Sequence, residues 1–236
     1  MLVIPKENLK VEYPGRGIII GKTRTHLIVG YFITARSEEN QARRLKHYAG
    51  ENKIMVDPTK PELLEREDAP LVFYPAITIK KDRIAVSNGQ QTRTVEQHLT
   101  QHETPAEILR HAHRKWRFEP DKPHYTPRIS GVVVGTQAAL AIIRRGKAGN
   151  ALRKTYPLKL QTGVAQFITT YEGHEATPLP AFKGGPKNIA LVGGGQKTIA
   201  DSIFRALNPN YRVSLAVVFR NLKTGETAVE IRNRHQ

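Results

Sequence analysis

"GIIIG" at residues 17–21 and "HLIVGYFIT" at residues 26–34 are rich in β-branched and aromatic side chains, and the polar stretch "KTRT" separates them. Two such stretches around a short polar connection predict a β-hairpin. A second hairpin is predicted for "LVFYPAITI" (71–79) and "DRIAVS" (82–87), which are joined by "KK". Strands that follow one another as hairpins indicate antiparallel sheets, and this pattern decides the fold class.

Further strands extend the same pattern. In "YRVSLAVVF" (211–219) every second residue is apolar or aromatic, which is the period-two pattern of a half-buried strand. We predict the remaining strands at residues 129–135, 138–144, 165–171 and 226–232.

Helices are predicted at mid-chain and near the end. Thr104, Pro105 and Glu107 form a capping box with proline at the first helical position, which predicts a helix that extends toward Trp116. A second helix is predicted at 196–207, a third at 94–101, and residues 57–70 are expected to be a proline-bounded connector with one helical turn. Hairpin strands with bunched helices imply an α+β fold with antiparallel sheets. We expect a single domain over residues 1–236.

The chain is strongly basic. Lysine and arginine number 37 against 21 aspartate and glutamate, which gives a formal net charge of +16. Such a charge favours an anionic partner, either a nucleic acid or a phosphorylated small molecule. Basic residues cluster at "RRLKH" (43–47), "HAHRKWR" (111–117) and "RRGK" (144–147), and charge alone does not choose between the two kinds of partner.

Several classes of protein are excluded by composition. The absence of cysteine excludes disulfides, thiolate nucleophiles and thiolate metal sites. No apolar run approaches the roughly 20 residues that span a bilayer, and "MLVIPKENLK" is too short and too quickly polar for a signal peptide. We therefore expect a cytoplasmic protein without membrane attachment.

Three motifs have simpler explanations than the sites they resemble. "LVGGGQKTIADSIF" (191–204) has Gln196 where a phosphate loop needs glycine, so a turn into a helix is favoured, although a helix N-terminus can receive phosphate. His98 is followed by Leu99 where a zinc protease needs glutamate, so we expect no metal site. The cluster "HAHRKWR" fits RNA binding or, more simply, a solvated helix face.

Polar residues gather where the predicted strands begin or end. "EYPGRGIIIG" (12–21) places an arginine between two glycines at a strand start, and "ITARSEENQARR" (33–44) follows another strand. "YPAITIKKDRIAVSNG" (74–89) ends in Ser-Asn-Gly, and "FEPDKPHYTPRISG" (118–131) is a loop with three prolines, which forbid a helix. Turn chemistry explains each singly, but together they predict a polar site at one rim of packed sheets.

These same blocks resemble the archaeal-type IMP cyclohydrolase family and its bacterial relatives. The resemblance runs from about Tyr13 to Phe182 and rests on "YPGRGIIIG", "ARSEE", "FYPAITI", "AVSNGQQT", "EPDKPHYTPRISG" and "FITTYEG". It implies a four-layered αββα sandwich of the N-terminal nucleophile hydrolase type, used without the terminal nucleophile, because the chain begins with Met1 and Leu2.

The resemblance also implies an activity. A formamido-imidazole-carboxamide ribonucleotide (FAICAR) would close its second ring with loss of water to give inosine monophosphate, the last step of purine synthesis. No metal or organic cofactor is implied, and a homo-oligomer is expected.

The matching blocks supply candidate residues. Glu119 is expected to be the general base, because it is the acid in the loop that matches the family. Tyr74 and Arg43 are expected to donate hydrogen bonds to the formyl oxygen. Asp121 is expected to cap the loop. Phosphate and ribose are expected to bind Arg36, Ser87, Asn88, Gly89, Thr126 and Arg128.

The chain departs from the bacterial relatives at several positions. Their Ser-Arg-Asn-Arg is Asn40-Gln41-Ala42-Arg43 here, and the aspartate of their Gln-Thr-Asp-Thr is Arg93. Their Gly-Glu-Gly-His is Gly163 to Gln166, with Val164 in place of the glutamate, and a second histidine is Thr169. Two alternatives therefore stay open: a nucleotide-binding homologue with altered or lost catalysis, and a basic RNA-binding protein.

Overall fold

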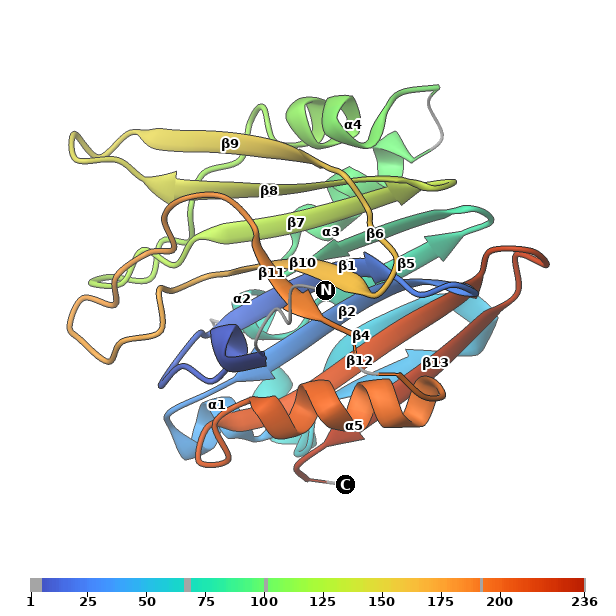
Figure 1. Ribbon diagram of the computed structural model, residues 1–236. Coiled ribbons are helices and arrows are strands. Elements are labelled where there is room, and N and C mark those ends of the chain that lie inside the picture. The colour runs from blue at the N-terminus through green and yellow to red at the C-terminus, as the bar shows by residue number, and fades with distance from the viewer. Residues whose placement is uncertain (1–5, 66–68, 100–101, 192, 236) are drawn as a thin grey trace.

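The computed structural model describes residues 6–65, 69–99, 102–191 and 193–235, whose strands form two antiparallel sheets (Figure 1). The first sheet has six strands in the order β11-β10-β1-β2-β12-β13. Their bounds are β1 Arg16–Lys22, β2 His26–Thr34, β10 Val164–Thr169, β11 Lys187–Ala190, β12 Arg212–Asn221 and β13 Thr227–Asn233.

The second sheet has seven strands, and each strand pairs with its neighbour in sequence. The order runs from β3 to β9 without a crossover, which is a meander. The bounds are β3 Arg43–Tyr48, β4 Lys53–Pro58, β5 Pro75–Lys80, β6 Arg83–Ser87, β7 Arg128–Val134, β8 Gln137–Arg145 and β9 Ala151–Leu158.

The main core lies between the two sheets. Alternate residues of the central hairpin β1–β2 face opposite ways, so Ile18 and Tyr31 pack against Ile77 and Val86 of the second sheet. Ile19 and its neighbours on the other face contribute to a separate outer core. Because both faces of this hairpin are covered, the interior residues of both strands are apolar.

Helices cover the outer face of each sheet. Helix α5 (Gln196–Ala206) packs Ile199 and Ile203 onto the six-stranded sheet. Helices α3 (Gln91–His98) and α4 (Pro105–Ala112) pack onto the seven-stranded sheet. The short elements are helices α1 (Glu38–Gln41) and α2 (Ala69–Val72) and the 3-10 turns Lys6–Leu9, Ala49–Glu51 and Pro61–Glu65. No described helix is long and apolar enough to cross a membrane.

One side chain joins the edges of the two sheets. The Asn233 amide on β13 accepts a hydrogen bond from the Leu45 N–H on β3 at 3.0 Å and donates to the Leu45 carbonyl at 3.1 Å. The backbone groups of an edge strand, which otherwise face solvent, are satisfied in this way. The sandwich is therefore closed along this side.

Most of the predicted elements are confirmed. Both hairpins are present, and the capping box of α4 forms as expected, although the helix ends at Ala112, before Trp116. The predicted strand at 71–79 begins only at Pro75, because residues 69–72 form helix α2. A short apolar run does not distinguish a strand from a helical turn.

Four strands were missed. Strand β4 occupies residues 53–58, part of which was expected to be a connector, and β11 has only four residues. Strands β3 and β9 are edge strands with several charged, exposed residues. The sequence of an edge strand carries little apolar periodicity, because its side chains need not be buried. The predicted helix at 94–101 begins earlier, at Gln91, and residues 100–101 lie outside the described residues.

Candidate active site

A cavity of about 270 Å³ lies where segments far apart in the sequence converge. Its wall includes the start of β1, the connection from β2 to β3, helix α2, the loop at 118–127 and the segment after β10. Of the residues predicted from the sequence, Arg36, Arg43, Glu119 and Thr126 line it. Tyr74, Ser87, Asn88, Gly89 and Arg128 do not.

Glu119 lies on the cavity wall with 2% of its surface exposed. Its Oε2 is 3.2 Å from a terminal guanidinium nitrogen of Arg16, and its Oε1 is 3.7 Å from one of Arg128. Burial raises the pKa of Glu119, whereas the two arginines oppose that rise. No described residue donates a hydrogen bond to Oε1, which is buried and faces Arg128.

Arg16 was not among the predicted site residues, although its setting between two glycines is a signal. Gly15 has φ +74°, and a Cβ there would lie 2.2 Å from Oγ1 of Thr170. A Cβ on Gly17 would lie 2.1 Å from the Phe32 ring. Only glycine fits on either side, so the pair allows β1 to place the Arg16 guanidinium against Glu119.

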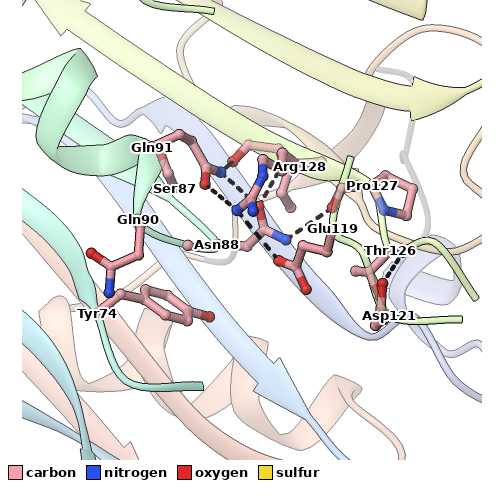
Figure 2. Close-up of polar contacts among 12 residues, drawn as sticks. Tyr74, Ser87, Asn88, Gln90, Gln91, Glu119, Asp121, Thr126, Pro127 and Arg128 are labelled. Atoms are coloured by element: carbon pink, nitrogen blue, oxygen red, sulfur yellow. Dashed lines mark hydrogen bonds and ion pairs between the residues drawn. The ribbon is translucent and has the colours of Figure 1, made fainter. Parts of the chain in front are cut away.

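The loop that carries Glu119 is braced by Asp121. The Thr126 N–H donates to Oδ1 of Asp121 at 2.7 Å, and the Thr126 hydroxyl donates to Oδ2 (Figure 2). The Glu119 N–H donates to the Thr126 carbonyl at 2.9 Å. Asp121 therefore caps the loop as expected, and the cap fixes the backbone on both sides of the general-base candidate.

A second buried arginine faces the same cavity. Arg43 is 4% exposed, and burial, together with the charge of Arg16, lowers its pKa. Burial also acts against the charge of Arg16, but Glu119 and nearby tyrosines outweigh it and raise the pKa of Arg16. The Nε atoms of both arginines lack a hydrogen-bond partner among the described residues. Buried donors without a partner are unusual, and here they line a cavity that could supply an acceptor.

Tyr74 lies behind the cavity instead of on its wall. Its hydroxyl is 2.6 Å from the hydroxyl of Tyr31, and both side chains are almost fully buried. Burial and the neighbouring Tyr74 raise the pKa of Tyr31. Both tyrosines act to raise the pKa of Arg16 and of Arg43, so the pair favours the charged form of each guanidinium.

The Ser-Asn-Gly turn also lies behind the cavity. The Ser87 hydroxyl donates to Ser130 at 2.8 Å, and the Asn88 amide donates to the Pro127 carbonyl at 2.9 Å and accepts from the Ile129 N–H. A Cβ on Gly89 would lie 2.6 Å from the Arg128 guanidinium. The side chains of this turn therefore bond to protein groups, which the sequence alone does not reveal, and its expected contact with substrate stays a prediction.

Arg128 also lies behind the cavity, where its guanidinium is close to the Glu119 carboxylate. Its guanidinium donates to Oε1 of Gln91 at 2.9 Å and to the Arg117 carbonyl at 3.0 Å, and it lies 4.9 Å from the centre of the Trp116 ring. Figure 2 shows Gln91, Arg128 and Glu119 joined by these polar contacts. The expected role of Arg128 in binding substrate directly is not supported by this position.

An aromatic wall completes the cavity and was not predicted. The rings of Tyr13 and Tyr171 stack at 5.9 Å, and the exposed Arg36 guanidinium lies 5.0 Å from the Tyr13 ring centre. His124 is also part of the lining, and its Nδ1 accepts a hydrogen bond from the Leu179 N–H at 3.1 Å. Burial lowers the pKa of His124. The described residues contain no group of three or more acidic or histidine side chains able to hold a metal ion.

Most departures from the bacterial pattern lie away from this cavity. Arg93 is on α3, and Val164 and Gln166 are on β10. None of the three belongs to the lining, whereas Asn40 does, together with Arg43, the last arginine of the bacterial block, which this chain retains.

Comparison with known proteins shows the family of this chain. The family model described as "IMP cyclohydrolase-like protein" matches residues 13–225. The chain belongs to this family. The IMP cyclohydrolase of Methanothrix thermoacetophila is 28% identical over 81% of this chain and 85% of its own length. That of Thermococcus kodakarensis is 28% identical over 72% of this chain and 79% of its own length.

A solved structure, the Anbu (Gly-1) mutant from Hyphomicrobium sp. strain MC1, covers 93% of this chain and 88% of its own at 11% identity. Its TM-score of 0.35 is too low to support an argument.

We predict that Arg16→Gln destabilises this IMP cyclohydrolase-like chain in a pH-dependent way. Removing Arg16 leaves the buried Glu119 charge with a weaker partner, which costs about 1–3 kcal/mol of unfolding free energy when Glu119 is ionised. The pKa of Glu119 rises further in the variant, so the loss is largest near about pH 8 and shrinks toward about pH 5, where protonation removes the charge. Urea denaturation across this range measures it.

Arg24→Gln is the matched control, because Arg24 is exposed in the turn of the same β1–β2 hairpin. Its effect is expected to be small and nearly independent of pH. Equal losses in the two variants, or a loss that grows on acidification, would contradict the assignment of Arg16 as the partner of Glu119.

Proposed function

We propose that this protein is an IMP cyclohydrolase, which closes the second ring of FAICAR with loss of water to give IMP. The family match and the names of the curated relatives support this activity. The observation that carries the proposal is the buried Glu119 carboxylate, with one oxygen unpartnered among the described residues, beside two buried guanidinium groups on a cavity wall.

Ring closure begins with proton removal. The carboxamide nitrogen of the substrate attacks the neighbouring formyl carbon in the same molecule, so holding the two groups in contact supplies much of the rate. The amide nitrogen must lose a proton, and the Glu119 carboxylate on the cavity wall is the proposed acceptor. Because burial raises its pKa, Glu119 is a stronger base than an exposed glutamate.

The formyl oxygen gains negative charge as the new carbon–nitrogen bond forms. Arg43 and Arg16 supply donors for this oxygen, since the Nε atoms of both lack described partners. The oxygen then leaves as water, with one proton from the carboxamide nitrogen and one from the formamido nitrogen. In this proposal Tyr74 acts through Tyr31 on the arginines and does not touch the substrate.

The substrate phosphate would lie at the exposed end of the cavity. Arg36, Ser37 and Asn40 line that end, and a guanidinium suits a phosphate because it donates two parallel hydrogen bonds. The imidazole ring would then lie against the tyrosine wall, with Thr126 near the ribose. Arg128 and the Ser87-Asn88-Gly89 turn would position Glu119 from behind.

The proposal also covers the number of domains, the layering of the fold, the oligomeric state and the location in the cell. One core shared by both sheets supports a single domain over residues 1–236, and helices on both outer faces support the αββα layering of N-terminal nucleophile hydrolases. A homo-oligomer in the cytoplasm is proposed from the family resemblance. Light scattering would measure the oligomeric state.

A second candidate is a purine-nucleotide-binding homologue with altered or lost catalysis. Asn40 favours it, because this departure from the bacterial pattern does line the cavity. We expect purified protein to convert FAICAR to IMP, followed by ultraviolet absorbance, with chelator present. Binding of FAICAR without turnover would favour the second candidate.

Glu119→Gln is expected to lower kcat on the order of 10²–10⁴-fold, because the amide cannot accept the proton. Glu226→Gln, in the exposed turn between β12 and β13, is the control with the same chemical change. Steady-state kinetics measures both variants. A nearly normal kcat in the Glu119 variant would show that the base lies elsewhere.

Arg36→Ala is expected to raise KM about 10-fold or more while kcat changes little, because a charge-assisted contact with the phosphate is lost. Arg24→Ala removes an exposed arginine far from the cavity and serves for comparison. An unchanged KM would remove Arg36 from the phosphate site.

A further inference from the structure

Two basic clusters that are separate in the sequence come together in the fold. The first is the segment after helix α4, and the second is the turn between β8 and β9. Arg153 donates to the carbonyl groups of His113 at 3.0 Å and Trp116 at 2.6 Å, and Arg117 donates to the Gly149 carbonyl at 2.9 Å. Figure 1 shows α4 lying over β8 and β9. These bonds make one continuous surface, here called the basic face, from Arg114, Lys115, Arg117, Arg145, Lys147 and Arg153.

The basic face lacks neighbouring acids. Every one of its six side chains is exposed. Residues 122–171 contain no aspartate or glutamate, and neither do residues 108–118. Within the described residues, no ion pair joins any member of the face to a carboxylate, whereas Arg232 elsewhere pairs with both Asp201 and Glu230. The positive field of this surface is therefore not cancelled locally, and it attracts a polyanion.

Aromatic side chains lie among the charged residues of the basic face. The Arg145 guanidinium lies over the Tyr125 ring, 4.3 Å from its centre, and Tyr125 contacts Phe118 edge-to-face at 5.5 Å. The Arg145 side chain is also exposed, so its guanidinium and the ring beneath it offer a surface on which a nucleobase can stack. Leu152 is the one exposed large apolar residue on the adjacent strand β9, so the surface lacks the apolar row of a membrane-binding helix.

We propose that the basic face binds single-stranded nucleic acid, with phosphates on its lysines and arginines and bases against the Arg145–Tyr125 stack. The proposal is independent of the cyclohydrolase activity, because no member of the face lines the cavity. The probe is a fluorescein-labelled RNA of about 12 nucleotides, a length typical of single-strand sites. Fluorescence anisotropy measures its Kd between about 50 and 200 mM salt.

The test compares two fourfold variants with equal net charge. R114Q/K115Q/R117Q/K147Q removes cations from the basic face, and R24Q/K197Q/R205Q/K223Q removes exposed cations from the other sheet and its helix. Each lost phosphate contact lowers the slope of log Kd against log salt by about 0.7, so the first variant is expected to lose roughly 3. The control variant is expected to keep the slope of the unchanged protein.

Far-ultraviolet circular dichroism confirms that each variant is folded. If the fourfold variant of the face does not fold, R114Q/K147Q is used, with half the expected loss of slope. Equal loss in the face and control variants would overturn the proposal, since binding would then reflect total charge. It would also be overturned if the protein bound phosphatidylserine vesicles but not the RNA.

Discussion

Burying the Glu119 carboxylate on a cavity wall costs free energy, and two guanidinium groups offset that cost. Neighbouring residues hold each of these two arginines in place. Arg16 lies between two glycines whose neighbours exclude a side chain, and Arg128 is fixed by Gln91 and by the Arg117 carbonyl. A buried ion pair offsets the cost of desolvation only when its charged groups are held in good geometry. Here the surrounding residues hold both guanidinium groups beside Glu119.

The same arrangement leaves the cavity with more positive than negative charge. Arg16, Arg43 and Arg36 line it, against Glu119 and Asp121, and Asp121 is committed to capping its own loop. Two guanidinium nitrogens also lack a described partner. An anionic ligand would supply hydrogen-bond acceptors for these nitrogens. The site is therefore complementary to a phosphorylated substrate and to an oxygen that gains charge. The charge of the cavity lining thus has the same sign as the net charge of +16 of the whole chain.

Much of the fold was predictable, because it rests on local patterns. The apolar hairpin at the centre of the first sheet and the capping box of α4 follow from residues that are neighbours in sequence. The site was predictable only in part. Glu119, Arg43 and Arg36 were found from the junctions that carry them, but the roles of Ser87 and Asn88 depend on which internal groups they meet. The stack of Tyr13 on Tyr171 joins residues that are far apart in the sequence, and no local pattern reveals it.

Burial also decides which groups near the site titrate. His113 lies behind it, bonded to Ser130, and burial with the nearby Arg153 and Arg128 lowers its pKa to about 3. His124, on the cavity wall, has its pKa lowered by burial and by Arg36. Both histidines are therefore neutral near pH 7 and add no cation to the cavity. Protonation of Glu119, whose pKa burial raises, would remove a negative charge from the site as the pH falls. It would remove both the proposed base and the partner of Arg16 in one step.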